Sequence, residues 1–398
     1  MVIKPRFKGY ICLTAHPQGC ANNVSDQIAY VKSQKPVIGP KNVLIIGAST
    51  GYGLASRIVS SFASGANTLG VAFERPASGN RTATPGWYNT AAFEQLASEA
   101  GYYAKTINGD AFSQPIKQET IAAIKKDLGK IDLVIYSIAS PKRTDPGTGE
   151  TFHSVLKPIG TVYSSKTVDF HTNIISNIEL GPATESEIQQ TVKVMGGEDW
   201  ELWIKALVQA DVLAEGAKTV AYTYIGSEIT KPIYRSGTIG KAKEHLEKTA
   251  LTLNKYLEKI KGEAYVSSNK ALATQASSAI PVVPLYVSLL MKIMKEKNIE
   301  EGCIEQIYRL YADRLYSKEL ILDEEGRIRL DDLELRQDVQ EEIIASWDKI
   351  TSENIAEITD IEDFRKEFFK LFGFEHPKVN YEEDIDANVD IPSLKALE

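Results

Sequence analysis

The chain has 398 residues, of which 43% are hydrophobic and 25% charged, so it is long enough for one large domain or two ordinary ones. Its net charge of −8 argues against nucleic-acid or membrane-surface binding, because no basic field would hold phosphates. The cysteines, Cys12, Cys20 and Cys303, are few and odd in number, which argues against a disulfide framework and predicts a protein of the reducing cytoplasm.

Residues 1–41 are interpreted as an N-terminal extension. The opening MVIKPRFKGY lacks the long apolar region of a signal peptide. Cys12 and Cys20 flank His16, but four good ligands do not converge there, so we expect no metal.

From residue 42 onward, short apolar runs alternate with helical segments. NVLIIGAS, TLGVAFE, YYAKTING and IDLVIYSIA are expected strands, and the helices between them are expected near 53–63, 91–100 and 116–128. Such runs are typical of strands buried on both faces of a parallel sheet. The pattern predicts a doubly wound α/β fold, a Rossmann-type parallel sheet like that of short-chain dehydrogenases.

The segment 141–218 has few strong periodic signals and is interpreted as an insert that leaves the sheet. Strands resume with TVAYTYIG and AYVSS, on either side of a helix after Ser236. Residues 279–398 are expected to be mostly helical, with one hairpin at LILDEEGRIRL. Since no clean linker is visible, we expect a single elaborated domain, residues 1–398, with its core over 42–278.

The longest apolar stretch, AIPVVPLYVSLLM at 279–291, is too short to span a bilayer and contains Pro281 and Pro284. We expect no membrane insertion. The stretch belongs inside the protein or along an apolar ligand.

LIIGASTGYGLASR places Gly47, Gly51 and Gly53 between an apolar strand and a helix. Glycines there permit a tight turn, close approach of a pyrophosphate, and free N–H groups at a helix N-terminus. The spacing G-x-x-x-G-x-G is the form found in short-chain dehydrogenases. A tight turn needs glycines in any case, so the neighbouring strands must decide.

The next strand ends in Glu74, where a carboxylate can accept hydrogen bonds from the adenosine ribose and repel a 2′-phosphate. This favours NADH over NADPH, although Arg75 beside it could bind that phosphate. The following strands end in residues suited to an adenine edge and to the nicotinamide ribose: Asp110 and Ala111, then Ser137, Ile138 and Ala139. Four strands ending in cofactor contacts at one edge predict that the core, 42–278, binds NADH.

Tyr234 and Lys243 are nine positions apart, which would place them on opposite faces of a continuous helix. They can act together only if Tyr234 precedes the helix. A lysine ammonium nearby would favour the phenolate and could also bind the nicotinamide ribose. Without the glycine turn, a surface tyrosine before a basic helix would be the simpler interpretation.

Tyr222 and Tyr224 lie two residues apart at a strand end, so we expect their rings on the same face. Packing of core aromatics is one interpretation. A second hydroxyl over the substrate carbonyl is the other, for Tyr224 especially.

Several segments together resemble the trans-2-enoyl-CoA reductase family, which includes the FabV-type enoyl-ACP reductases. They are GASTGYG, FERP, INGDAF, YSIASPKRT, MGGEDW, TQASSAIPVVPLY and the nine-residue spacing from Tyr234 to Lys243, and the similarity runs along essentially the whole chain. The resemblance implies a monomer in which Tyr234 donates the proton, Lys243 binds NADH and Tyr224 contacts the substrate thioester. In addition to Asp110, Ala111, Ser137, Ile138 and Ala139, the expected cofactor contacts are Gly47, Ala48, Ser49, Thr50, Gly51, Tyr52, Gly53, Phe73, Glu74, Leu272, Ala273 and Thr274. The resemblance places the last three at the nicotinamide end.

The expected reaction is NADH-dependent reduction of a trans-2-enoyl thioester, with hydride added at C3 and the enolate charge held by hydrogen bonds from Tyr224 and Tyr234. The stretch 279–291 is a candidate wall for the acyl chain, and core packing is the alternative. The carrier is CoA or acyl carrier protein, either of which would favour positive charge such as Lys142 and Arg143. The family serves both fatty-acid synthesis and fermentation, and no FAD is expected.

Two other functions stay open. A ketone or alcohol oxidoreductase of the short-chain type would reduce simple ketones rather than crotonyl-CoA. A non-catalytic NADH-binding sensor would bind NADH without turnover.

Overall fold

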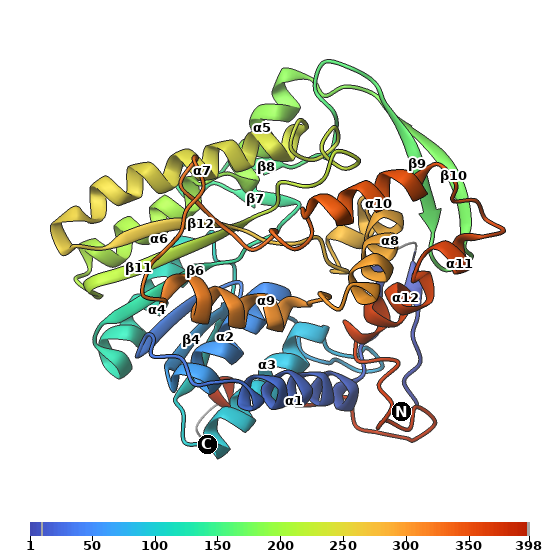
Figure 1. Ribbon diagram of the computed structural model, residues 1–398. Coiled ribbons are helices and arrows are strands. Elements are labelled where there is room, and N and C mark those ends of the chain that lie inside the picture. Colours follow the sequence, from blue (N-terminus) through green and yellow to red (C-terminus); the bar gives the residue numbers. More distant parts are fainter. Residues whose placement is uncertain (9–10, 396–398) are drawn as a thin grey trace.

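The computed structural model describes residues 1–8 and 11–395, built around one seven-stranded parallel sheet (Figure 1). Its strands are β3 (Asn42–Ile46), β4 (Asn67–Ala72), β5 (Ala104–Asn108), β6 (Ile131–Tyr136), β11 (Leu213–Thr223), β12 (Glu263–Ser268) and β13 (Arg327–Arg329). They lie in the order β13-β12-β11-β6-β3-β4-β5. From β3 the chain adds β4 and β5 on one side and then β6, β11, β12 and β13 on the other. This confirms the doubly wound Rossmann-type fold that the sequence predicted.

The central strand β3 shows why the apolar runs are continuous. Val43 and Ile45 pack into one core cluster, and Leu44 and Ile46 pack into another. All four side chains are fully buried. Alternate residues of a strand point to opposite faces, so both faces of this sheet must be covered by helices.

Two helical layers provide that cover. One layer contains α1 (Pro17–Ser33), α2 (Gly51–Ser64), α3 (Pro85–Glu99) and α9 (Cys303–Arg309). The other contains α4 (Gln114–Ala123), α6 (Glu198–Gln209) and α7 (Thr238–Leu257). The helices α2 and α3 begin earlier than the sequence indicated, at Gly51 and Pro85.

The region between β6 and β11 leaves the sheet as two antiparallel hairpins followed by a helix. These are β7 (Lys142–Thr144) with β8 (Thr151–His153), β9 (Tyr163–Asp169) with β10 (Ile174–Leu180), and α5 (Glu185–Met195). The following helix, α6, returns to the sheet through Trp200 and Trp203. A further short pair, β1 (Phe7–Lys8) and β2 (Ile11–Cys12), lies near the N-terminus, where Gly9 and Tyr10 of the N-terminal motif fall outside the described residues.

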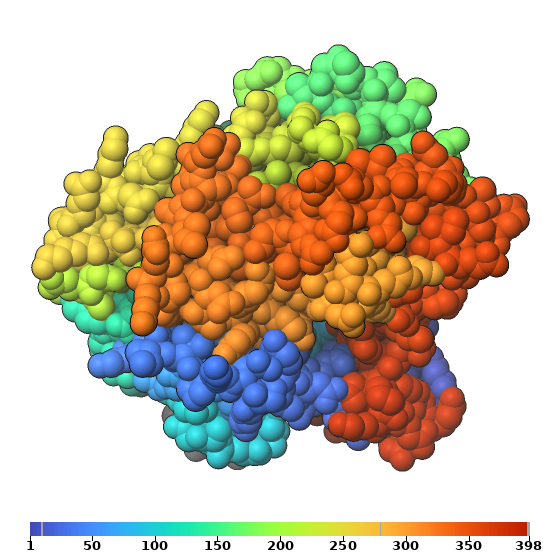
Figure 2. Space-filling model, in the orientation of Figure 1, coloured from blue at the N-terminus to red at the C-terminus, as the bar shows by residue number. Residues whose placement is uncertain are grey.

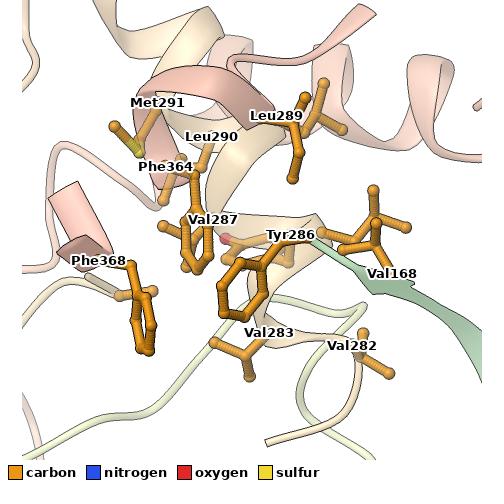
Figure 3. Packing of buried hydrophobic residues seen from close by; sticks show 14 of the residues in the cluster. Val168, Val282, Val283, Tyr286, Val287, Leu289, Leu290, Met291, Phe364 and Phe368 are labelled. Carbon is orange, nitrogen blue, oxygen red and sulfur yellow. The ribbon is translucent and has the colours of Figure 1, made fainter. Parts of the chain in front are cut away.

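The C-terminal part packs around α8 (Val283–Glu296), together with α10 (Gln337–Trp347), α11 (Ile355–Ile358) and α12 (Ile361–Lys370). Figure 3 shows α8 side chains among Phe364 and Phe368 of α12 and Val168 of β9. Figure 2 shows the orange and red residues covering the middle and right of the face in view. The remaining turns are π-helical at Ile124–Leu128 and Leu310–Leu315, and 3-10 at Glu258–Ile260, Ser277–Ala279 and Pro392–Leu394.

The hairpin predicted at LILDEEGRIRL is wrong. Only Arg327–Arg329 forms a strand, and it pairs in parallel with β12 rather than with the residues before it. The reason is tertiary, because β12 offers an otherwise unpaired edge of the main sheet. Within the described residues, no helix is long and apolar enough to cross a membrane.

Candidate active site

The glycine turn joins β3 to α2 and leaves open space for an anion. Gly47 and Gly51 have φ of 89° and 52°, a backbone region that favours glycine. A Cβ at Gly53 would overlap the carbonyl oxygen of Gly47, whereas a Cβ at Gly51 would meet no atom within 4 Å. The first N–H groups of α2 have no partner within the helix, and its first turn has no acidic residue. These features fit a pyrophosphate.

Glu74 lies just beyond the end of β4 and faces the glycine turn. Its Oε1 accepts a hydrogen bond of 2.6 Å from the Ser49 hydroxyl. Burial raises the pKa of Glu74, and the hydrogen bond from Ser49 lowers it. The neighbouring Phe73 ring is 75% exposed, which offers an apolar surface for a purine beside the Glu74 carboxylate.

The ends of β5 and β6 complete the same edge. The Ala111 carbonyl accepts hydrogen bonds from Lys117 Nζ at 2.9 Å and Trp203 Nε1 at 3.1 Å, which fix it in place. Ser137 donates its N–H to the Ile46 carbonyl at 2.8 Å, so β6 and β3 end together. The other expected contacts on these strand ends are Asp110, Ile138 and the exposed Ala139.

Tyr234 precedes helix α7, as the nine-residue spacing required. Its carbonyl accepts hydrogen bonds from the N–H groups of Gly237 and Gly240, at 3.1 and 2.9 Å, where the helix starts. Lys243 lies in the second turn, and its Nζ donates to the Tyr222 carbonyl at 3.0 Å. Burial lowers the pKa of Lys243 to about 8, and Glu247 raises it.

The Tyr234 hydroxyl is unusual because no described residue forms a hydrogen bond with it. Its half-buried ring packs edge-on against Tyr224, with the ring centroids 4.9 Å apart. Burial raises the pKa of Tyr234 to about 12, so the hydroxyl keeps its proton at neutral pH. The sequence predicted that a nearby ammonium would favour the phenolate, but burial is the dominant influence here, and the Lys243 ammonium is directed to a backbone carbonyl.

Tyr222 and Tyr224 do not act as a pair. The Tyr222 hydroxyl lies 2.6 Å from Ser56 Oγ, beneath α2. Tyr224 follows the last residue of β11, and its ring belongs to the cluster around α8. Because β11 ends at Thr223, between these two residues, only the Tyr224 ring packs against Tyr234.

Glu334 is a residue of this site that was not predicted from the sequence. This carboxylate is fully buried and accepts hydrogen bonds from Tyr224 at 3.0 Å, Tyr286 at 2.7 Å and the Ala271 N–H at 2.7 Å. It stands in the acidic run DDLELRQD, where nothing in the sequence distinguishes it from solvated neighbours. A buried carboxylate with three donors is a strong organising element.

Glu334 also braces the segment that the family resemblance places beside the nicotinamide. Ala271 immediately precedes Leu272, Ala273 and Thr274, which are half-buried. Ser277 Oγ donates to the Leu272 carbonyl at 2.6 Å and fixes the other end. The Tyr52 hydroxyl donates to the Lys270 carbonyl at 3.0 Å, so the Tyr52 side chain supports this segment. Only the backbone of Tyr52 contributes to the glycine turn.

Two other expectations change. The side chains from Val283 to Met291 lie in the core, which is the alternative that the sequence left open for the apolar stretch. Arg143 is buried and donates to Glu198 Oε2 at 2.7 Å, so it is not free to meet an anionic carrier, whereas Lys142 is exposed.

No group of three His, Cys, Asp or Glu side chains within residues 1–8 and 11–395 could hold a metal ion. His16 instead caps α1, where its Nδ1 accepts a hydrogen bond from the Gly19 N–H at 3.2 Å.

Known proteins resemble this chain over nearly its full length. Three family models match: "NAD(P)H binding domain of trans-2-enoyl-CoA reductase" at residues 2–79, "Trans-2-enoyl-CoA reductase catalytic region" at 81–316, and "Enoyl reductase FAD binding domain" at 322–385. The chain is 58% identical to a trans-2-enoyl-CoA reductase [NADH] of Ruminiclostridium cellulolyticum, over 99% of this chain and 100% of the relative. It is also 58% identical to an enoyl-[acyl-carrier-protein] reductase [NADH] of Cytophaga hutchinsonii, with the same coverage.

A solved structure shows the same architecture. The crystal structure of the Treponema denticola trans-2-enoyl-CoA reductase in complex with NAD is 51% identical and superimposes with a TM-score of 0.94. The match covers 98% of this chain and 99% of that one.

The third family model names FAD, but the residues that it matches do not fit a flavin dinucleotide. Within the described part of 322–385, α10 has Asp338 in its first turn, and α12 has Glu362 and Asp363. These carboxylates would repel a pyrophosphate at either helix N-terminus. The glycine turn before α2 is the site suited to a dinucleotide.

Proposed function

This chain belongs to the trans-2-enoyl-CoA reductase family, and we propose that it reduces trans-2-enoyl thioesters to saturated acyl thioesters with NADH. The proposal depends above all on one observation. The Tyr234 ring packs against Tyr224 beside the helix that carries Lys243, and its hydroxyl has no hydrogen-bond partner among the described residues. Burial raises the pKa of this hydroxyl, which favours its protonated form.

In this proposal the strand ends hold NADH. The N–H groups of the first turn of α2 bind the pyrophosphate, Glu74 accepts hydrogen bonds from the adenosine ribose, and Lys243 binds the nicotinamide ribose. When bound, NADH supplies the hydride that adds to C3 of the enoyl group. The negative charge of Glu74 would repel the 2′-phosphate of NADPH, which supports NADH as the cofactor.

Tyr234 and Tyr224 then stabilise the charge that develops on the thioester oxygen. Both hydroxyls are proton donors at neutral pH, because burial raises the pKa of each above its ordinary value. Hydrogen bonds to that oxygen strengthen only as the enolate forms, so they lower the barrier rather than merely binding substrate. A proton from Tyr234 then reaches C2, which forms the second C–H bond and completes the reduction.

The acyl chain lies against half-buried apolar residues of the cluster that includes Tyr224, namely Leu156, Ile229, Ala273 and Ile280. The carrier is CoA or acyl carrier protein, the two named for the relatives. A monomeric, cytoplasmic enzyme of lipid metabolism remains our prediction, as does the division into core and C-terminal part at residue 278.

Steady-state kinetics test the proposal. We expect NADH oxidation with crotonyl-CoA and longer enoyl-CoA substrates, weaker activity with NADPH, and none with a panel of simple ketones. Tight NADH binding without turnover on any enoyl-CoA or enoyl-ACP would contradict the proposal and favour a sensor. Turnover of ketones alone would favour a short-chain alcohol oxidoreductase.

A further inference from the structure

Glu334 lies where it can decide what Tyr224 does with its single proton. Glu334 Oε1 is 3.0 Å from the Tyr224 hydroxyl and 2.7 Å from the Tyr286 hydroxyl, and its Oε2 is 2.7 Å from the Ala271 nitrogen. An ionised carboxylate can only accept hydrogen bonds, whereas a protonated one can also donate. A tyrosine hydroxyl has one proton to give.

An ionised Glu334 therefore competes with the substrate. The bond from Tyr224 to a buried carboxylate is charge-assisted and roughly twice as strong as a neutral one. The other neighbour of the Tyr224 hydroxyl, Thr230 Oγ1, is uncharged and lies at 3.2 Å, so it is the weaker competitor. While Glu334 is ionised, the Tyr224 proton points away from the thioester oxygen.

A protonated Glu334 reverses this arrangement. Tyr286 already accepts a hydrogen bond from Gln340 Nε2 at 3.3 Å and donates its own proton to Glu334. The carboxyl proton is then best directed to the Tyr224 oxygen, which frees the Tyr224 proton. The resulting chain runs from Glu334 to Tyr224 to the substrate oxygen, with every donor matched to an acceptor.

We propose that Glu334 is a positioning residue that sets the direction of the hydrogen bond at Tyr224, so that Tyr224 donates to the thioester oxygen only when Glu334 carries a proton. This inference rests on the proposed reduction of enoyl thioesters. Glu334 touches neither substrate nor cofactor and acts through Tyr224.

The surroundings allow this proton to exchange near neutral pH. Burial raises the pKa of Glu334 to about 7, the Ala271 N–H, the Tyr286 hydroxyl and the Lys270 ammonium lower it, and Asp331 raises it. Lys270 Nζ is itself held by Glu300 Oε1 at 2.9 Å. Since a raised carboxyl pKa keeps the proton up to that value, the active arrangement is present below it and is lost as the pH rises.

The test compares pH profiles of kcat/KM for crotonyl-CoA at saturating NADH, so that weaker NADH binding as Lys243 loses its proton does not enter the comparison. For the wild type we expect a fall of about tenfold between about pH 6 and pH 8, as one proton with a pKa near 7 is lost. Glu334→Gln should keep high activity and a flat profile over this range, because its amide donates to Tyr224 and its oxygen accepts from Ala271. Tyr286 then directs its own proton to Ser227 instead of to position 334. Asp332→Asn, which removes a carboxylate two residues away that contacts Arg309 and Arg314 rather than Tyr224, should keep the wild-type profile.

A second variant guards against misfolding of Glu334→Gln. The residual activity of Tyr224→Phe should show no ionisation near neutral pH, since Glu334 has no hydroxyl left to act through. Identical profiles for wild type and Glu334→Gln, or a flat profile in Asp332→Asn, would overturn the inference while leaving the reductase proposal intact. A wild type without enoyl-CoA turnover would instead overturn the proposed function.

Discussion

Removing the Tyr234 hydroxyl should separate catalysis from stability more cleanly than any other change in the site. In Tyr234→Phe the ring stays packed against Tyr224, and no hydrogen bond to a described residue is lost. We therefore expect the free energy of unfolding to change by less than about 0.5 kcal/mol. NADH affinity should also be preserved, because the cofactor contacts that we propose lie on the strand ends and on Lys243.

Turnover should fall steeply. Loss of one donor to a developing oxyanion typically costs about 10²–10³ in kcat, or about 2.7–4 kcal/mol of transition-state stabilisation. The assay is NADH oxidation with crotonyl-CoA under single-turnover conditions, which reports the chemical step directly. Near wild-type turnover in Tyr234→Phe would remove this residue from the mechanism.

Two matched tyrosines sharpen the comparison. Tyr222→Phe loses a hydroxyl that contacts Ser56 Oγ at 2.6 Å, so it should lose stability and keep normal turnover. Tyr224→Phe loses its bond to buried Glu334 and should cost about 1–3 kcal/mol of stability as well as activity. If urea denaturation showed Tyr234→Phe to be destabilised as much as Tyr224→Phe, the Tyr234 hydroxyl would have a structural partner and the reasoning would fail.

Three further changes test the cofactor site. Gly53→Ala adds a Cβ that overlaps the Gly47 carbonyl oxygen, so the turn must shift. The dissociation constant of NADH should rise at least about tenfold in a fluorescence titration. An unchanged dissociation constant would contradict this role of the turn. Glu74→Gln removes the charge that opposes a 2′-phosphate, and the ratio of kcat/KM for NADPH to NADH should rise about tenfold, whereas a constant ratio would exclude Glu74 as the selector. Burial lowers the pKa of Lys243 to about 8, so its ammonium is lost above that pH. NADH affinity should therefore weaken above about pH 8 in the wild type but stay constant in Lys243→Met. Parallel curves of NADH affinity against pH for the two proteins would count against this role.

The sheet was predictable because its signal is local. Val43 to Ile46 form a short, unbroken apolar run that ends at Gly47, which is typical of a strand covered on both faces. The position of Tyr234 before a helix was also accessible, because helical periodicity excludes a shared face for residues nine apart. Both inferences depend only on local sequence and on the known geometry of strands and helices.

The parts that the sequence did not predict depend on tertiary contacts. Arg327–Arg329 has no strand pattern, and it becomes a strand because β12 presents a free edge. The apolar stretch of α8 suits either a core or a ligand wall, and periodicity cannot separate the two. Glu334 looks like a surface carboxylate until Tyr224, Tyr286 and Ala271 converge on it.

The C-terminal part therefore has a role in the site that does not require a second cofactor. Strand β13 adds an edge to the NADH-binding sheet, and a few residues later Glu334 joins two segments of the candidate site, at Tyr224 and at Ala271. Without these residues, β12 would have unpaired backbone groups along one edge, and the Ala271 N–H would lose its acceptor. The geometry of the reacting groups is thus fixed by packing from a region that is distant in sequence, so its integrity should matter for turnover even where its residues touch neither substrate nor NADH.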